Sequence, residues 1–192
     1  MIKRILKWTA LALLSLAFLG VLALFVAYWR SSNECPEKAA APGHPMKAIV
    51  YCEFGSPDVL HFQDIEKPVP NDNQVLIKVR AASVNPYDWH FMRGIPYLMR
   101  MEAGLRKPKD IRLGGDVAGQ VEAVGKNVTQ FKPGDEVFGL CSGAFAEYCL
   151  GRSKLALKPE NISFEQAASV PVAALTALQA LRDRGKVPPG QK

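Results

Sequence analysis

The stretch from Leu113 to Leu140, LGGDVAGQVEAVGKNVTQFKPGDEVFGL, constrains the fold of this chain more than any other. Its glycines stand at positions 114, 115, 119, 125, 134 and 139. Glycine reaches positive φ angles without steric cost, so dense glycine is typical of tight turns and bulges rather than of a helix. Residues 117–124 alternate in character with period two, which predicts a half-buried strand. Lys132–Asp135 (KPGD) predicts a type II turn, and the next strand is expected over Glu136–Leu140.

Short strands and turns continue on both sides of this stretch. Apolar alternation predicts strands over Met46–Phe54 and Gln74–Val84 before it, and over Gly143–Leu150 and Lys154–Lys158 after it. Asn85-Pro86 is expected to begin a short helix or turn that runs to Gly94, because proline suits the first helical position. The pattern predicts a fold class that is mainly β with short helices, arranged over residues 46–160 as a compact, barrel-like domain.

Residues 161–192 are expected to form connecting helices. Ser163-Phe164-Glu165-Gln166 is a capping box, in which the serine and glutamine side chains each satisfy a free backbone donor. Pro171 should interrupt the helix that this box opens, because proline lacks an N–H and clashes with the preceding turn. A second helix is predicted from Pro171 to Arg184, with Gly185 as its C-terminal cap.

The N-terminal region contains a run of 22 residues, 8–29, without a formal charge. About 20 apolar residues cross a bilayer as a helix, and Trp8, Tyr28 and Trp29 suit the two interfaces. A cleaved signal peptide is the alternative, but its apolar core spans about 7–15 residues and precedes a small-residue cleavage site. This run is longer and ends in Tyr28-Trp29-Arg30. We therefore expect a single-pass membrane anchor in residues 1–30, followed by a Pro-, Gly- and Ala-rich linker in residues 31–45.

The charged residues and cysteines exclude some classes of function. The net charge of +6 comes with no basic stripe of interleaved aromatics, so no nucleic-acid partner is expected. The basic run 93–112 is expected to be a solvated loop, with phosphate steering as the alternative. The cysteines at 35, 52, 141 and 149 lack C-x-x-C or framework spacing and are expected to be thiols rather than disulfides or metal ligands.

The order of motifs resembles one known family. G-x-D-x-A-G-x-V-x-x-V-G followed by V-x-x-F-K-P-G-D-x-V-F-G is similar to the N-terminal domain of medium-chain dehydrogenases/reductases, in the zinc-independent quinone oxidoreductase branch. The resemblance covers Met46–Lys192 and implies a GroES-like fold. It also implies hydride transfer from NADPH or NADH to a small molecule, which would be a quinone, an enone or a carbonyl compound. The family keeps its cofactor on a Rossmann domain that begins after P-G-Q-K, where this sequence ends.

Comparison with zinc-dependent alcohol dehydrogenases predicts that no metal is bound. Their three zinc-ligand positions fall on Asn85, Gly115 and Val172. None of these supplies a cysteine sulfur, a histidine nitrogen or a carboxylate, the donors typical of zinc sites. The cysteine-rich structural-zinc lobe of those enzymes is missing as well.

The same resemblance implies four site residues, and each has a plainer interpretation. Tyr87 and His90 are the catalytic candidates, because donors must meet the charge that grows on a substrate oxygen and imidazole titrates near neutral pH. Tyr87 is otherwise a packing residue, and His90 a turn residue without a role. Asn85 and Thr176 are the cofactor-binding candidates, with a turn cap and a helix-interior residue as their alternatives. Asp88 and Asp116 are expected to be structural.

Three hypotheses about the whole chain remain open from the sequence. In the first, the chain is the N-terminal part of a membrane-anchored, zinc-free NAD(P)H-dependent oxidoreductase and is inactive alone. In the second, it is a non-catalytic, membrane-tethered GroES-like binding module, and in the third a truncated fragment. Lysines and arginines flank residues 8–29 equally, so the positive-inside rule gives no orientation. The need for a reduced nicotinamide favours a cytosolic domain. The resemblance also leaves open a homodimer.

Overall fold

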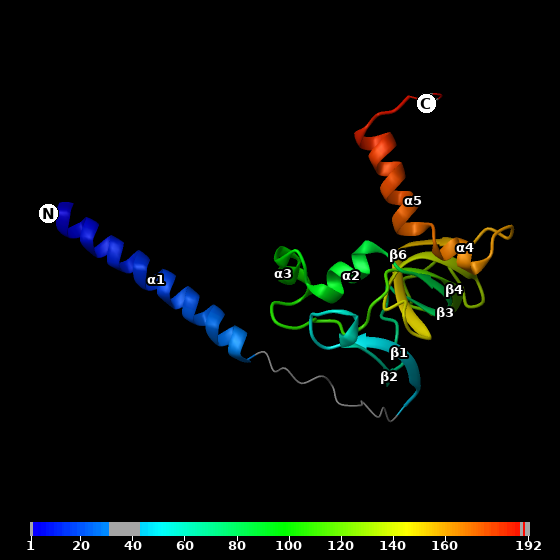
Figure 1. Cartoon of the computed structure of the whole chain (residues 1–192), viewed down its shortest axis with the longest axis horizontal. Helices are drawn as coiled ribbons and strands as arrows, with labels where there is room; N and C mark the ends of the chain where they lie inside the picture. The colour runs from blue at the N-terminus through cyan, green and yellow to red at the C-terminus, as the bar shows by residue number, and fades with distance from the viewer. Residues whose placement is uncertain (1, 31–42, 189, 191–192) are drawn as a thin grey trace.

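The computed structural model describes residues 2–30, 43–188 and 190. Figure 1 shows α1 and α5 extending in different directions away from the strands, which lie together. In chain order the elements are α1 (Ile2–Arg30), β1 (Pro45–Tyr51), η1 (Pro57–Val59), β2 (Leu60–Glu66), β3 (Val75–Ser83), α2 (Pro86–Arg93), η2 (Tyr97–Met99), α3 (Arg100–Ala103), β4 (Asp116–Val124), β5 (Glu136–Ser142), β6 (Tyr148–Leu157), α4 (Phe164–Ala168), α5 (Pro171–Leu178) and η3 (Gln179–Arg184). The prediction of a mainly β domain with short helices is confirmed.

Four antiparallel strands form the centre of the domain. β3 pairs with both β4 and β6, and β5 lies between β4 and β6, so the strands close into a barrel. Its interior is filled by the inward side chains of alternating positions, as period-two patterning requires. The buried residues of this core are Val75, Ile77, Val117, Val121, Val137 and Cys149 of the strands, together with Phe131 and Ala144 of the connecting segments.

Two glycines of the stretch 113–140 show why that stretch needs them. A Cβ on Gly119 in β4 would clash with the carbonyl oxygen of Lys78 in β3, so the close approach of the two strands requires glycine. Gly134 lies in open space but has a φ of 95°. Its turn is closed by a hydrogen bond of 3.2 Å from the Asp135 N–H to the Lys132 carbonyl, which fits the predicted type II turn.

The strand boundaries differ from the prediction in two places. β1 and β2 form a separate two-stranded sheet, and β2 was not predicted. Its sequence LHFQDIE buries only Ile65, so apolar alternation gives little signal there. The two strands expected over residues 143–150 and 154–158 are instead one strand, β6, which pairs with β3 at one end and β5 along its length.

The C-terminal helices begin and end at the predicted residues, but the last six residues, Gln179–Arg184, are wound differently. The capping box is formed, with the Ser163 N–H donating to Gln166 Oε1 at 2.9 Å and the Gln166 N–H to Ser163 Oγ at 3.2 Å. The chain breaks before Pro171, as expected. Gly185 caps the end of this helix as predicted, but with a φ of −74° rather than in the left-handed conformation that favours glycine. The Gly185 N–H bonds to the carbonyl of Ala180, which continues the wider winding of η3, and the left-handed residue is Lys186, with φ 48°.

Helix α1 and the cysteines complete the comparison. Within α1, Lys7–Trp29 is long and apolar enough to cross a membrane, and large apolar side chains such as Leu13 and Phe18 are exposed along it. Most of the predicted linker lies outside the described residues, as does Cys35. The expectation of thiols holds for Cys141 and Cys149, but Cys52 is disulfide-bonded.

Candidate functional site

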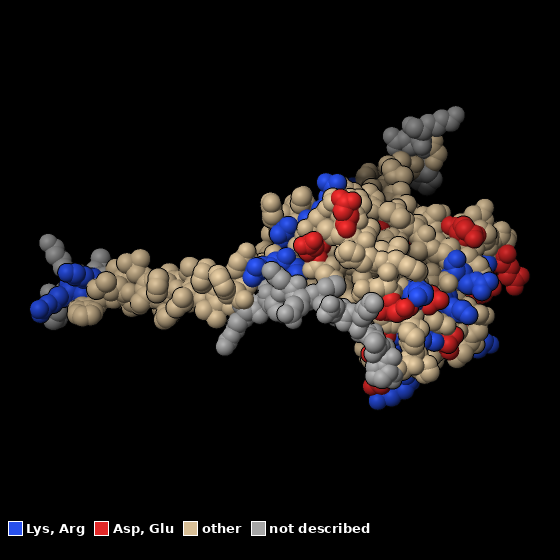
Figure 2. Space-filling model, turned by 60° about the horizontal axis from the view of Figure 1, so that its bottom comes forward, with Lys and Arg blue, Asp and Glu red and all other residues tan. Residues whose placement is uncertain are grey.

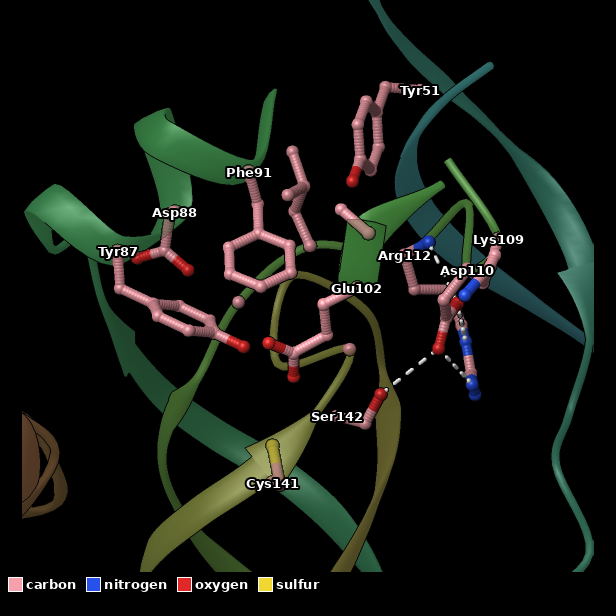
Figure 3. A pocket seen from close by; sticks show the side chains of 14 residues that line it. Tyr51, Tyr87, Asp88, Phe91, Glu102, Lys109, Asp110, Arg112, Cys141 and Ser142 are labelled. Carbon is pink, nitrogen blue, oxygen red and sulfur yellow. Dashed lines mark hydrogen bonds and ion pairs between the residues drawn. The ribbon is translucent and has the colours of Figure 1, made fainter. Parts of the chain in front are cut away.

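Two cavities adjoin each other beside the barrel, and Tyr87 lines both. One has a volume of about 250 Å³ and extends toward β1 and α3, whereas the other, of about 600 Å³, extends toward β6 and α5. Helix α2 places Tyr87 and Phe91 one turn apart, so their rings pack together with centroids 4.4 Å apart (Figure 3). The residues common to both cavities are Tyr87, Asp110, Arg112, Cys141 and Ser142.

A charged pair forms part of the lining of both cavities. Arg112 donates through Nε and Nη2 to the two oxygens of Asp110, at 2.9 and 2.8 Å, and Ser142 Oγ donates to Asp110 Oδ2 at 3.0 Å (Figure 3). Burial opposes ionisation of Asp110, but the hydrogen bonds and charge of Arg112 more than offset it and hold the pKa of Asp110 below its usual value. The interpretation of residues 93–112 as a solvated loop is therefore wrong for its end, which is part of the cavity wall.

Two phenols of the smaller cavity hold their protons strongly. Burial, together with the negative charges of Glu102 and Asp88, raises the pKa of Tyr87. Burial and the neighbouring Asp110 raise the pKa of Tyr51 to about 12. Both hydroxyls are therefore protonated at neutral pH, and each is able to donate a hydrogen bond to an oxygen in the cavity.

The thiol of Cys141 lies between the two cavities. Burial and the neighbouring Cys149 raise its pKa well above the usual range, so this group is a neutral thiol rather than a nucleophilic thiolate.

Asp116 bonds or adjoins the three positions that the sequence comparison above aligned with zinc ligands. Its side chain is fully buried, and Oδ2 accepts hydrogen bonds from Asn85 Nδ2 at 2.9 Å and from the Val172 N–H at 3.2 Å. Gly115 precedes it in the chain, and a Cβ there would lie 3.6 Å from the Tyr87 ring. Within the described ranges, no group of three His, Cys, Asp or Glu side chains could hold a metal ion.

The structure places the four predicted site residues differently. Tyr87 lines both cavities. Asn85 is not among the lining residues of either cavity and directs its amide at Asp116 and at Ser83 Oγ, 3.2 Å away. His90 stacks on Trp89, with Nδ1 2.7 Å from the Ile95 carbonyl oxygen, and is not among the lining residues of the two cavities. Thr176 is exposed on α5.

Sequence reasoning missed Tyr51, Asp110, Arg112 and Cys141 as cavity residues. The sequence signal for the charged pair was an acidic residue, Asp110, two positions before Arg112 within an otherwise basic run. Tyr51 and Cys141 gave none, because the other residues that line the cavities with them come from distant parts of the chain.

The structural role predicted for Asp88 is supported by its contact with Asn85. Asp88 is buried, and its Oδ2 accepts a hydrogen bond of 2.8 Å from the Asn85 N–H. This bond satisfies a free backbone donor at the start of α2.

Comparison with known proteins gives a consistent family. Residues 71–163 match the alcohol dehydrogenase GroES-like domain. Human quinone oxidoreductase is 42% identical over 141 residues, which are 71% of this chain and 40% of that protein. The chain thus spans less than half the length of this relative.

Solved structures agree with the sequence relatives. The quinone oxidoreductase from Coxiella burnetii superimposes with a TM-score of 0.66 at 37% identity, covering 74% of this chain and 46% of that one. A mycobacterial protein solved in complex with NADPH gives a TM-score of 0.66 at 33% identity, covering 76% and 43%. This chain therefore carries an alcohol dehydrogenase GroES-like domain of the quinone oxidoreductase-like kind found in the medium-chain dehydrogenase/reductase superfamily.

Proposed function

We propose that this chain forms one wall of the active-site cleft in a zinc-free, NAD(P)H-dependent oxidoreductase that reduces a quinone, an enone or another carbonyl compound. The observation that carries the proposal is the pair of cavities around Tyr87, built on a domain whose relatives are quinone oxidoreductases. Hydride transfer to such a substrate develops negative charge on its oxygen, which hydrogen-bond donors must stabilise. The protonated phenol of Tyr87 supplies a donor of this kind.

In this proposal His90 moves protons rather than binding the substrate. Its contact with the Ile95 carbonyl assigns the proton to Nδ1, because a carbonyl oxygen only accepts. Nε2 is then the basic nitrogen, available for a relay. The relay requires the His90 side chain to approach the cavity that Tyr87 lines. Asn85 supports the nicotinamide end of the cofactor from behind, through its hydrogen bond to Asp116.

The residues present fit only the nicotinamide end of NADPH or NADH, which would supply the hydride. Pyrophosphate is usually held where a glycine-rich loop opens a helix, whereas Gly114 and Gly115 lead into strand β4. In the proposal, a dinucleotide-binding domain forms the second wall and covers α5 and η3. This arrangement is supported by apolar side chains that α5 and η3 leave exposed close to Thr176, namely those of Leu175, Leu178 and Leu181.

The absence of zinc is part of the proposal. Asn85 and Val172 direct their hydrogen-bond donors at Asp116 rather than presenting lone pairs to an ion. Metal analysis of the purified chain should find no stoichiometric zinc, and one tightly held zinc per chain would contradict this part.

We further propose that α1 anchors the domain in a membrane, with the barrel in the cytosol, where a reduced nicotinamide is available. Disulfides are rare in the cytosol, so the bond at Cys52 argues for the opposite side. Asn127-Val128-Thr129 is a glycosylation acceptor sequence on an exposed turn and can decide the orientation. In translation with endoplasmic reticulum microsomes, Asn127 should stay unmodified; a glycan lost in Asn127→Gln would place the barrel in the lumen.

The function is tested by joining the dinucleotide-binding domain of human quinone oxidoreductase after Lys192 and measuring NADPH-dependent reduction of quinones and enones. The joined protein should turn over, whereas the chain alone should not, and should bind NADPH more weakly than about 10 μM. Tyr87→Phe should lower kcat by about 10²-fold or more, the usual effect of removing one oxyanion donor. His90→Ala should lower kcat more than it raises KM.

Tyr97→Phe is the matched control, because Tyr97 is exposed and does not line either cavity. Full activity of the Tyr87 and His90 variants would remove both residues from the mechanism. A correctly folded joined protein that binds NADPH but reduces nothing would favour the non-catalytic binding module.

A further inference from the structure

An apolar and basic surface surrounds α3 on the side of the domain that α1 reaches. Leu98 and Met101 are 75% and 70% exposed, which is unusual for side chains of this size. We call the exposed apolar residues of this segment the α3 patch: Ile95, Tyr97, Leu98, Met101 and Leu105. Basic side chains of the same segment accompany it, namely Arg93, Arg100, Arg106, Lys107 and Lys109. Figure 2 shows lysines and arginines gathered where α1 meets the rounded body.

The α3 patch is held in shape from beneath. Arg100 lies over the rings of Phe54 and Tyr97, at 4.6 and 4.9 Å, and its Nε donates to the Gly94 carbonyl at 3.0 Å. Ala103 is buried on the inner side of α3. These contacts fix the backbone of the segment, so the apolar side chains on its outer side are exposed as a result of the fold.

The α3 patch also adjoins the end of the apolar run of α1. Arg106 Nη1 donates to the Tyr28 carbonyl at 3.0 Å, and its guanidinium lies 4.4 Å from the centre of the Tyr28 ring. Tyrosine near the end of a spanning helix lies at the level of lipid headgroups. If α1 spans a bilayer through Lys7–Trp29, this contact brings the α3 patch to the same level.

We propose that the α3 patch docks on an anionic phospholipid surface. Apolar residues enter the boundary between headgroups and acyl chains, and lysine and arginine attract anionic lipids, as in interfacial helices. The inference rests on the membrane anchoring proposed above. Docking would set the smaller cavity beside the lipid, because Glu102, Ala103 and Lys109 of the same segment line it.

The test is hydrogen exchange of the full chain reconstituted in vesicles of phosphatidylcholine, with or without phosphatidylserine. Backbone amides of residues 95–109 should exchange several-fold more slowly in the vesicles that contain phosphatidylserine. Each basic residue near an anionic surface contributes about fivefold to the equilibrium, from roughly 1 kcal/mol per charge. The double variant Arg106→Gln/Lys107→Gln should therefore lower the equilibrium constant for docking about 25-fold. The double variant Leu98→Ser/Met101→Ser should remove the protection of residues 95–109 from exchange.

Matched controls remove the same chemistry elsewhere. Lys78→Gln/Lys132→Gln deletes two exposed charges of the barrel, and Val69→Ser deletes an exposed apolar side chain; both should keep the protection. Equal exchange of residues 95–109 in the two kinds of vesicle would overturn the docking proposal.

Alkaline extraction of the same vesicles reports on the anchor independently. If the chain stays in the membrane but residues 95–109 show no lipid-dependent protection, the docking proposal is wrong and the anchor proposal is unaffected. A chain that is released contradicts the anchor, and the same exchange comparison with added vesicles then tests the α3 patch by itself.

Discussion

At the scale of single residues, Asp116 ties together three parts of the chain. One oxygen, Oδ2, accepts from Ser83 Oγ at 3.1 Å as well as from Asn85 and Val172. In Asp116→Asn, the amide oxygen is able to take the place of Oδ2, but the new NH2 group then lies where Oδ1 is buried without a hydrogen-bond partner. Because this leaves a buried donor unpaired, the free energy of unfolding should fall by about 1–3 kcal/mol. Thermal unfolding of the detergent-solubilised chain measures the loss. Asp72→Asn, which breaks only an exposed ion pair with Lys126, should stay within about 1 kcal/mol of the wild type.

A second residue-scale prediction concerns Tyr51 and high pH. Its pKa of about 12 exceeds the value of roughly 10 for a free phenol. The native state therefore keeps this proton after the unfolded state has lost it. The protonated phenol of Tyr51 therefore adds to the free energy of unfolding. This contribution is complete below about pH 10 and is lost as the pH rises toward 12. Absorbance titration should show a phenolate step at the highest pH that Tyr51→Phe removes and Tyr97→Phe retains.

The roles and surroundings of single residues were also the features that the sequence predicted least well. Tyr87 was identified through a family resemblance and lines both cavities, and its catalytic role stays a prediction. The partly buried pair of Asp110 and Arg112 was not identified, because a charged run usually lies in solvent and only the tertiary fold turns its end inward. The position of His90, outside both cavities, depends on a contact with Ile95 that no spacing rule predicts.

At the scale of elements, two glycines of one stretch serve different physical needs, and substitution should separate them. Gly119→Ala places a methyl group against the Lys78 carbonyl and forces β3 and β4 apart, which should cost more than about 3 kcal/mol and broaden the native amide spectrum. Gly134→Ala meets nothing within 4 Å and strains only its φ of 95°, at about 1–2 kcal/mol. Equal losses in urea unfolding would contradict this distinction.

Elements were predictable where local chemistry decides them. The capping box at Ser163, the break at Pro171 and the turn at Gly134 all follow from side chains acting within a few residues. Strand β2 was missed because six of its seven residues are not fully buried, so its pairing with β1 rather than its own pattern makes it a strand. The helix ends at Arg184 as predicted, but its last six residues are wound as the π-helix η3, which the sequence did not indicate.

At the scale of the whole molecule, the exposed apolar face of α5 and η3 predicts a covering domain. In the joined protein, Leu178→Ser should weaken the contact between the two domains, raise KM for NADPH and lower the thermal midpoint of unfolding. In the chain alone the same variant should leave the midpoint unchanged and improve solubility, because Leu178 is exposed there. Limited proteolysis between the domains measures the contact. Leu157→Ser, an exposed substitution on β6, is the control.

The hydrogen bond from Val172 to Asp116 fixes where the cleft is able to flex. It fastens the first turn of α5 to the barrel wall, so in the proposed enzyme a motion that opens and closes the cleft is restrained at the base of this helix. The wider turns of Gln179–Arg184 lie beyond that fastening, and π-helical segments are frequent at functional sites. The pivot of such a motion would therefore lie in η3, at the far end of α5, and α5 would travel with the barrel as a rigid arm.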